Sequence, residues 1–527
     1  MNTTIADYGK RDIGSVATQG GSFLRVGELA SYGVEWSDCT RVTSMGGMAY
    51  FGHFLHANGL FDDLVEGCPL TYTSNNAPGK RRVLGTLVSG ILNGARRYAH
   101  LSHIQGDRLC ADALEINGGF ASEDSVRRGL RQGTRTNWVA WEAWLSRAEM
   151  AAVLPLLSEQ YILDLDTSVK LMYGHQEGAE IGYNPTRPGR PSQAIHVGFI
   201  GGLRLLVAMD VQGGKKHAAC HMAPQIWKWV DGLPPACRPR LIRGDIGFGN
   251  EGYLCECEGR KLPHLFKLKM SAKVKKLIPK LAIQQGKLWQ TTPDGWDVIE
   301  SRVKLKGWSR ERRIVVLRRP FRTGKSKRRK EPDWLPHLQM QDACRDWEYA
   351  VLVCSQDLSA ESLPKLYAER ADCENVLDEL KNQWGLSGFT TQDLKRCKVM
   401  ARLTALICNW WNVFARIAEP TEHKEALTSR PELLHLIATL VTHAGKNVLR
   451  FCSHHENSLD VKRAFYRLHT VFSRIEAIAG QLNRQMVWAI QLSVAFYAWL
   501  RGKVLKVSSE AENTVRELAP PAVPALG

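Results

Sequence analysis

The spacing of apolar residues changes its period along the chain. Between residues 40 and 144 apolar positions recur at helical spacing and are interrupted by glycines. From residue 161 apolar and polar residues alternate, which is typical of half-buried strands. Helical spacing returns in the apolar segment 395–417 and continues to residue 505, and 508–527 resembles a frayed tail. The pattern predicts a strand-containing middle region between two helical regions.

The middle region carries several separate strand patterns. The first strand is expected over 161–169, and a helix is expected near 224–230. Further strands are expected over 194–200, 203–211, 240–245, 263–269, 288–291, 296–303, 313–317 and 347–354. This alternation of strands with helical segments predicts the α/β class.

Acidic residues interrupt two of these strands. Alternation in the first strand places Asp164 and Asp166 on one face and Leu163 and Leu165 on the other. Two acids on an apolar strand are costly unless a cation or a hydrogen-bond donor receives them. An edge strand with both acids in water is the alternative. Asp245 ends a later strand before flexible glycines, where it could reach a ligand or merely form a turn.

A helix expected over 367–381 carries a second polar pattern. At about 100° per residue, Tyr367, Arg370, Glu374 and Lys381 lie within a sector of roughly 60°. One face therefore presents a phenol, a guanidinium, a carboxylate and an ammonium. The alternative is a solvated face whose cations pair with neighbouring acids, worth a few tenths of a kcal/mol each.

Two other segments carry candidate phosphate contacts. The loop 174–191 is stiffened by prolines and bent by glycines, and its Arg187 and Arg190 either bind phosphate or face solvent. A short helix after Ser122 carries three arginines and is a weak candidate for a DNA-reading helix. Solvated arginines on a packing helix are the alternative. These three residues are Arg127, Arg128 and Arg131.

Charge adds a stronger indication of the partner. The chain has 527 residues, enough for two to four domains, and a net charge of +17. Residues 266–330 contain 21 Lys and Arg against 4 Asp and Glu, which equals the excess of the whole chain. Such a concentration favours a polyanionic partner over a generally basic surface. The run 318–330 is expected to be a mobile loop whose cations contact DNA, among them Arg318, Arg319, Lys327, Arg328 and Arg329.

Cysteine usage and hydropathy bear on the compartment. The 13 cysteines form no regular framework, and residues 1–22 are polar and glycine-rich. We therefore expect reduced thiols and a cytoplasmic location. The apolar run 487–500 is too short to span a bilayer and is expected to be a buried helix, so no membrane partner is expected.

The order and spacing of these motifs resemble a known family. Asp166 and Asp245 followed by Tyr-x2-Arg-x3-Glu-x6-Lys are similar to the signature of DDE transposases of the IS4-like group. The punctuated loop 173–191 resembles that of the IS1380 family. The similarity covers about residues 161–411 and extends more weakly to residue 82. The resemblance implies an RNase H-like catalytic core with a β-rich insertion between the second and third acids, flanked by helical N- and C-terminal regions.

The resemblance also implies a chemistry. Asp166, Asp245 and Glu374 would be catalytic ligands of two Mg²⁺ ions, with Mn²⁺ able to substitute. Carboxylate oxygens suit such hard cations. Tyr367, Arg370 and Lys381 would hold DNA. The protein would then be a magnesium-dependent transposase that binds the inverted-repeat ends of an insertion sequence as a homodimer, cleaves them as an endonuclease and joins them to target DNA.

Alternatives remain within that resemblance. A transposase-derived DNA-binding protein without catalysis and a two-metal nuclease without strand transfer share the same motifs. Relatives that form hairpin intermediates can carry a tryptophan after the signature arginine, where this chain has Ala371. Trp384 could take its place or could pack in the core.

The expected domain division follows the same pattern. It comprises a helical N-terminal region that binds DNA ends, a core in two parts separated by the basic insertion, and a helical C-terminal region. The corresponding boundaries are 1–157, 158–270 for the first part of the core, 271–346 for the insertion, 347–420 for the second part, and 421–527.

Overall fold

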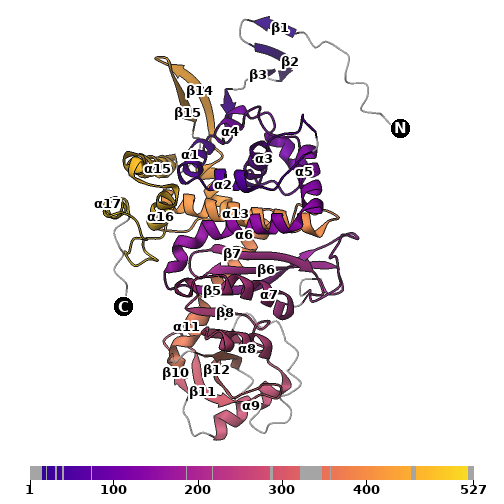
Figure 1. Cartoon of the computed structure of the whole chain (residues 1–527), viewed down its shortest axis with the longest axis vertical. Coiled ribbons are helices and arrows are strands. Elements are labelled where there is room, and N and C mark those ends of the chain that lie inside the picture. The colour runs from indigo at the N-terminus through magenta and orange to yellow at the C-terminus, as the bar shows by residue number, and fades with distance from the viewer. Residues whose placement is uncertain are drawn as a thin grey trace.

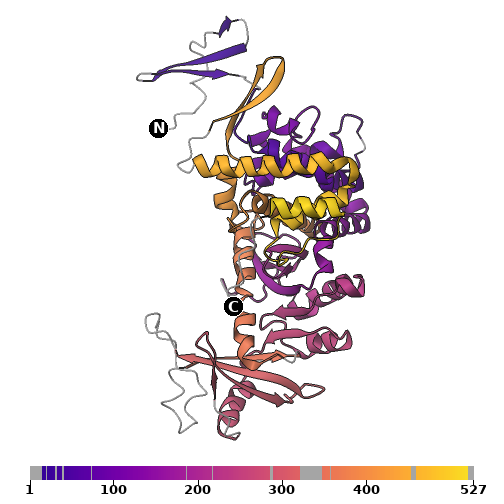
Figure 2. The ribbon, with the colours of Figure 1, turned by 90° about the vertical axis from the view of Figure 1, so that its left-hand side faces the viewer.

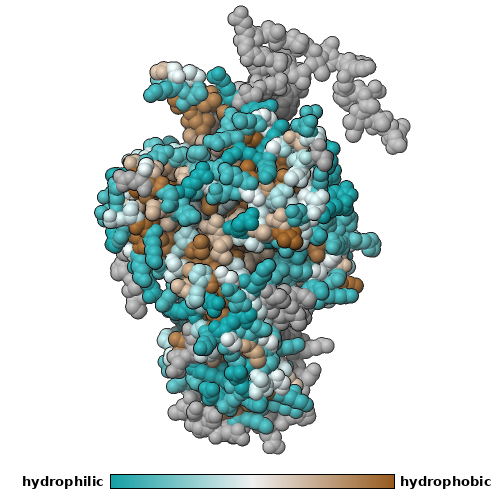
Figure 3. All heavy atoms as spheres, viewed as in Figure 1, coloured by the Kyte–Doolittle hydropathy of each residue, from teal (hydrophilic) through white to brown (hydrophobic). Residues whose placement is uncertain are grey.

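The protein is elongated, with helices gathered in one half and a large sheet in the other (Figure 1). The computed structural model describes residues 15–18, 21–29, 32–37, 41–72, 74–184, 187–216, 218–284, 289–320, 347–355, 358–452 and 458–519. Most side chains on the face in Figure 3 are hydrophilic, while apolar side chains gather on the hairpin at the helical end.

A nine-stranded mixed sheet forms the centre of the protein. Its spatial order is β10-β11-β12-β13-β9-β8-β5-β6-β7. The strands are β5 (Ile162–Leu171), β6 (Ser192–Ile200), β7 (Leu205–Gly213), β8 (Leu241–Gly244), β9 (His264–Lys267), β10 (Gln290–Thr291), β11 (Asp297–Val303), β12 (Arg312–Pro320) and β13 (Trp347–Cys354). The predicted α/β class is thus confirmed as a mixed α/β fold with a large mixed sheet.

Strand directions divide this sheet into two zones. β5, β6 and β7 are antiparallel, whereas β8 and β9 run parallel to β5. β10 to β13 add an antiparallel zone on the far side of β9. Every residue of β6 and β8 is buried, as expected for central strands that are covered on both faces. The edge-strand alternative for the two acids of β5 is wrong, because β5 pairs on both sides.

Helices connect the parallel strands and cover the sheet. α7 (Ala218–Asp231) follows β7, and α8 (Glu251–Gly259) joins β8 to β9. α13 (Leu394–Ala418) is the long buried helix that the sequence predicts, and it packs along β7 across the long axis of the molecule (Figure 1). In the turned view the yellow C-terminal helices lie in front of this part of the molecule (Figure 2). The Asn409 amide on this helix accepts from Leu206 N at 2.9 Å and donates to Leu206 O at 2.7 Å. These two bonds attach α13 to the edge strand β7.

The N-terminal part is mainly helical from residue 48. Its helices are α1 (Met48–Asn58), α2 (Leu60–Gly67), α3 (Lys80–Leu92), α4 (Arg108–Asp112), α5 (Glu123–Thr136) and α6 (Trp138–Val153). Strands precede them, contrary to the prediction of a wholly helical region: β1 (Ser15–Thr18), β2 (Gly21–Leu29), β3 (Tyr32–Ser37) and β4 (Val42–Thr43). β1 to β3 form a sheet of their own, while β4 pairs with β14 of the C-terminal part.

The C-terminal part also departs from the all-helical prediction. Its helices are α14 (Ala426–Leu433), α15 (Ser458–Ile478), α16 (Arg484–Ala495) and α17 (Ser509–Leu518), the last within the segment expected to be a frayed tail. Between α14 and α15 lies the hairpin of β14 (Ile437–His443) and β15 (Lys446–Cys452). Its turn is Ala444-Gly445, and both residues have positive φ, which is the geometry that two-residue hairpin loops require.

The basic region 271–346, predicted to be β-rich, begins with a helix. α9 (Ala272–Gln284) precedes β10, and β10 to β12 extend the central sheet through β13. Arg318 and Arg319 lie in β12, so the prediction of a mobile loop is wrong for these two residues. Lys327, Arg328 and Arg329 lie outside the described residues.

The sheet contains a buried histidine that gives stability a pH dependence. His264 on β9 is 1% exposed, and burial lowers its pKa from 6.5 to about 4. The unfolded chain therefore binds a proton at a higher pH than the folded chain, and stability falls as the pH falls from 6.5 towards 4. At about 1.4 kcal/mol per pKa unit the loss is about 3 kcal/mol.

We predict that His264→Phe removes this part of the acid sensitivity. Urea denaturation between these two pH values should give a smaller fall in the free energy of unfolding for the variant than for the wild type. Equal falls in both proteins would show that His264 does not carry this pH dependence.

Candidate active site

Asp166 lies on β5 and is 7% exposed. Its Oδ1 lies 3.1 Å from Nη2 of Arg370 and accepts the Thr167 backbone N–H at 2.8 Å. Burial raises the pKa of Asp166, Arg370 and the Thr167 N–H oppose this shift, and the nearby charges of Asp245 and Glu374 add to it. The carboxyl is therefore buried beside two further acids and one cation.

Asp245 reaches the same place because of strand register. β8 runs parallel to β5, with Gly244 opposite Leu165. The next residues along the two chains are Asp245 and Asp166, so the end of β8 brings the two acids together. Asp245 Oδ1 accepts the Gly247 N–H at 2.9 Å, which fixes the turn that leaves the strand. The predicted position at a strand end is confirmed.

Glu374 approaches from the helix α12 (Ala371–Asn382). Its side chain is 73% exposed, and its Oε1 lies 3.9 Å from Nη1 of Arg370. The guanidinium of Arg370 thus lies between Asp166 and Glu374. Sheet and helix bring the three predicted acids to one cluster, in which Asp166 is buried and Glu374 faces solvent.

Arg370 is the counter-charge of this cluster. It is 4% exposed, and its Nη2 also donates to Leu165 O at 3.2 Å. Burial works to lower its pKa, but the negative charges of Asp166 and its neighbours outweigh burial and raise it. The sequence suggested a surface arginine that grips DNA. The structure instead places its side chain inside, against a carboxylate.

The predicted single helix over 367–381 is broken. α11 (Leu363–Ala368) ends before Arg370, and α12 begins after it. In a continuous helix Leu366 O would accept from the Arg370 N–H. Here Leu366 O accepts from Nη1 of Arg243, and the Arg370 N–H turns to Tyr367 O at 3.2 Å. A tertiary contact therefore ends α11, although the local sequence contains no glycine or proline at the break.

Tyr367 and Lys381, the other two residues of the predicted face, have different environments. Tyr367 is half-buried, and its pKa is raised to about 12 by burial, against the opposing effect of Arg370 and with a further contribution from the three acids. Lys381 donates from Nζ to Ser168 Oγ at 2.7 Å. Ser168 shares the β5 face of Asp166, so Lys381 ties α12 to the strand that carries the first acid.

Arg243 is a residue of the site that the sequence reasoning missed. It is buried on β8 and binds Asp164 through two bonds, of 2.6 and 2.7 Å. It also lies 3.3 Å from Glu369. Each acid of β5 therefore has its own arginine, since Arg243 pairs with Asp164 as Arg370 pairs with Asp166. The available signal was an arginine within an apolar strand, because a buried cation requires a partner.

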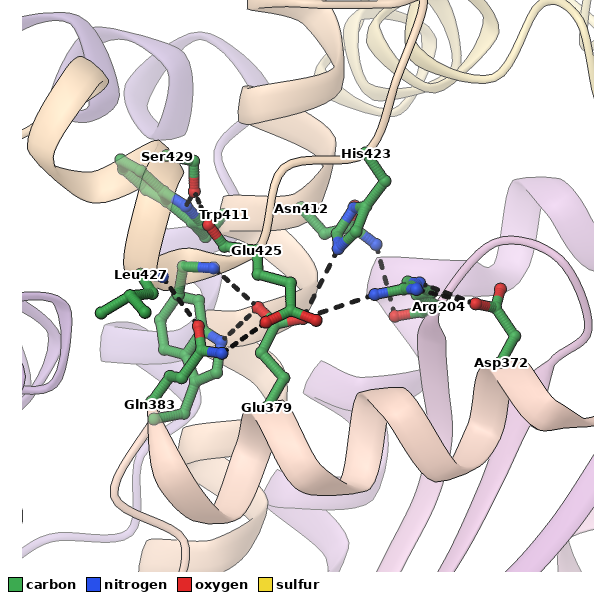
Figure 4. A network of polar contacts seen from close by, with 12 residues as sticks. Arg204, Asp372, Glu379, Gln383, Trp411, Asn412, His423, Glu425, Leu427 and Ser429 are labelled. Atoms are coloured by element: carbon green, nitrogen blue, oxygen red, sulfur yellow. Dashed lines mark hydrogen bonds and ion pairs between the residues drawn. The ribbon is translucent and has the colours of Figure 1, made fainter. Parts of the chain in front are cut away.

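A polar network holds the far side of α12 (Figure 4). Its centre is Glu379, which accepts from Trp384 Nε1 at 3.1 Å and from the Ala426 N–H at 3.0 Å. Burial works to raise the pKa of Glu379, but its hydrogen bonds, including that from His423, outweigh burial and lower it. Trp384 is buried in this network, so its role is packing. Arg204 links the network to the start of α12, through Asp372 at 2.8 Å.

The other predicted DNA contacts lie in different settings. Arg187 is exposed, whereas Arg190 stacks on Tyr173 at 4.7 Å. Arg318 pairs with Asp297 at 3.0 Å and stacks on Trp289 and Trp347. Arg319 pairs with Glu348 at 2.9 Å and stacks on Trp296. These two arginines are therefore held within the sheet by intramolecular contacts.

The three acids of the cluster have the ligand atoms that a hard divalent cation prefers. Asp166, Asp245 and Glu374 offer only carboxylate oxygens, the donors that Mg²⁺ and Mn²⁺ prefer. Within the described ranges, no three Asp, Glu, His or Cys side chains are already close enough to hold a metal ion. The guanidinium of Arg370 lies among these acids and supplies a positive charge there.

The fold and this acidic cluster define an α/β protein with a candidate phosphoryl-transfer site. The chain belongs to the family described as Transposase DDE domain group 1, whose model matches residues 36–473. DDE transposases generally use divalent metal ions. The comparison with curated proteins gives no match.

Among solved structures, the chain is similar to a piggyBac transposase synaptic complex with hairpin DNA. The TM-score is 0.38 and the identity 10%, over 91% of this chain and 86% of that chain. In the part of the chain that the structure describes, no helix is long and apolar enough to cross a membrane.

We predict that Arg370→Gln destabilises the protein by about 3–5 kcal/mol near pH 7, because it leaves the Asp166 carboxylate buried without its cation. The pKa of Asp166 is already raised and should rise further without Arg370. A folded state that holds a proton more tightly than the unfolded state gains stability as the pH falls. The deficit should therefore shrink at about pH 5.

Urea denaturation measures both effects. Adding Asp166→Asn to the Arg370→Gln variant should restore most of the lost stability, because no uncompensated charge remains. Arg463→Gln, which breaks an exposed ion pair, is the matched control and should cost at most about 1 kcal/mol. A pH-independent deficit without rescue would contradict this account of the pair.

Proposed function

We propose that this protein is a DNA transposase of an IS1380-like insertion sequence. It binds the inverted-repeat ends of the element, cleaves them and joins them to target DNA by metal-dependent phosphoryl transfer. The observation that carries the proposal is the cluster of Asp166, Asp245 and Glu374 around one buried arginine. Two neighbouring parallel strands and a helix supply these acids from distant parts of the sequence.

The topology supports an RNase H-like core. The strand order β7-β6-β5-β8-β9 combines three antiparallel strands with two that run parallel to the first. The first acid lies on the central strand, the second at the end of its parallel neighbour, and the third on a helix. In the proposed domain division, the residues from α9 to β12 form the insertion between the second and third acids.

Asp166, Asp245 and Glu374 are the residues proposed to hold two Mg²⁺ ions, for which Mn²⁺ can substitute. When bound, such ions activate the attacking oxygen and stabilise the leaving oxygen of an in-line displacement. Asp166 provides a fixed carboxylate because β5 and its hydrogen bonds hold it. Glu374 provides an exposed carboxylate that faces the solvent from which DNA approaches.

The signature cations then act as positioning residues rather than as surface contacts to DNA. Arg370 favours the ionised form of the buried Asp166 and orients its carboxylate, while Nη1 of Arg370 faces Glu374. Lys381 fixes α12 against β5 through Ser168. Tyr367 lies half-buried beside the same acids and is proposed to donate a hydrogen bond to the DNA backbone. Double-stranded DNA is the proposed partner, with two copies of the chain in the complex.

We predict that Asp166→Asn, Asp245→Asn and Glu374→Gln each reduce Mg²⁺-dependent cleavage by at least about 100-fold, because each removes charge that holds the metal ions. The substrate is a duplex that carries the ends of the genomic element encoding the protein. The measurement is single-turnover cleavage, with end binding followed by mobility shift. End binding should persist in all three variants.

Asp378→Asn is the matched control, because Asp378 is an exposed carboxylate on the same helix that bonds only Asn382 in the described structure. This variant should cleave like the wild type. Including a target plasmid separates the alternatives: insertions indicate a transposase, cleavage alone a nuclease, and binding alone a DNA-binding protein. Full cleavage by any acid variant would remove that residue from the site.

A further inference from the structure

A broad polar groove lies beside the helix α5, away from the acid cluster. It has a volume of about 1070 Å³, which is at the upper limit for small-molecule pockets. One wall is α5, whose Ser122 side chain caps the helix by accepting the Ser125 N–H. The other wall is formed by Gln176 and Glu177 together with residues 390–396. Its size and polarity suit a segment of a macromolecule better than a small apolar ligand.

Two of the four acids that line this groove are paired with arginines of the chain. Asp124 pairs with Arg127 at 2.9 Å and with Arg128 at 2.7 Å. Asp393 caps α13 and pairs with Arg396 at 3.3 Å. Of the other two acids, Glu177 accepts the Leu394 N–H at 2.9 Å, and Glu123 lies in the first turn of α5, where the helix dipole favours a negative charge.

Three cations of the groove remain without a carboxylate partner in the described ranges. They are Arg131 and Arg135 on α5 and Lys395 at the start of α13, and all three are exposed. Lys395 lies over the Trp138 ring at 5.8 Å. Arg131 and Arg135 are one helical turn apart, which separates them by about 6 Å along the helix axis. This separation is close to the length of two base-pair steps of duplex DNA, at about 3.4 Å each. The six Lys and Arg of the lining exceed its four acids, so the groove carries a net positive charge.

Two chain segments lead from the acid cluster to this groove. β5 carries Asp166 and runs on towards Gln176, and the segment after α12 runs from Glu374 to Thr390. At about 3.4 Å per residue, Asp166 lies about 17 Å from the end of β5 at Leu171. A hydrogen bond from Glu177 N–H to Gln392 O at 3.1 Å joins the two segments at the wall. A DNA duplex bound in the groove would therefore reach the acid cluster several base pairs away from the groove.

We propose that this groove binds the phosphate backbone of duplex DNA next to the cleavage point, through Arg131, Arg135 and Lys395. The proposal rests on the proposed function, and it names a contact surface remote from the catalytic acids. The uncompensated cations supply the charge complementarity. The polar wall of Gln176, Thr390 and Gln392 supplies hydrogen-bonding groups to the same backbone.

The test compares two triple variants that lose equal charge. The groove variant is Arg131→Gln, Arg135→Gln and Lys395→Gln. The control is Lys462→Gln, Arg474→Gln and Lys506→Gln, whose exposed cations lie on or after α15. α15 and α5 lie at opposite edges of the molecule in Figure 1. Fluorescence anisotropy with a mixed-sequence DNA duplex, at about 50 to 200 mM KCl, gives the slope of log affinity against log salt.

The groove variant should bind more weakly, and its slope should be smaller by about 3, because each lost phosphate contact reduces it by about 1. The control should keep the wild-type slope, and so should Arg131→Lys with Arg135→Lys. A wild-type slope in the groove variant, or an equal loss in the control, would overturn the groove proposal. Cleavage of end-bearing DNA by the unaltered protein, measured in parallel, decides the proposed function separately.

Discussion

The buried pairing of β5 carboxylates with arginines is the constraint on which the site depends. An ionised acid inside a sheet is unfavourable unless a cation meets it with good geometry. Asp164 receives Arg243 from β8, and Asp166 receives Arg370 from the turn between α11 and α12. Each pair joins β5 to another element, so the two pairs together fix the parallel strand β8 and the start of α12. Arg243 also determines where α11 ends, because it donates to Leu366 O, the carbonyl that would accept from the Arg370 N–H in a continuous helix.

The position of Glu374 follows from how α12 is held. One side of the helix is tied to β5 through Arg370 and Lys381, and the other is held by the network around Glu379. The helix is thus fixed while the Glu374 side chain itself stays exposed. In this site Asp166 is buried and held in place, Asp245 lies at a strand end, and Glu374 is exposed to solvent. Such an arrangement suits chemistry on a large substrate that approaches from solvent.

The spacing of apolar residues predicted the helices and strands that local sequence determines. It did not predict features that depend on contacts between distant parts of the chain. The acids of β5, the strand end at Asp245 and the buried helix α13 could be predicted because alternation and helical spacing reflect burial. The break before Arg370 could not, since it depends on Arg243, more than 100 residues away. Charge counting wrongly placed Arg318 and Arg319 in a mobile loop, because composition does not reveal that tryptophans and acids of neighbouring strands contact them. The β14–β15 hairpin was missed although its Ala-Gly turn was visible.

The most direct test of the central claim is metal binding, independent of turnover. Electron paramagnetic resonance of Mn²⁺ distinguishes free from bound ions in a titration of the purified protein. The account predicts specific binding by the wild type and by Asp378→Asn, and its loss in Asp166→Asn, Asp245→Asn and Glu374→Gln. Mn²⁺ bound equally well by those three variants would contradict the claim that these acids form one metal site.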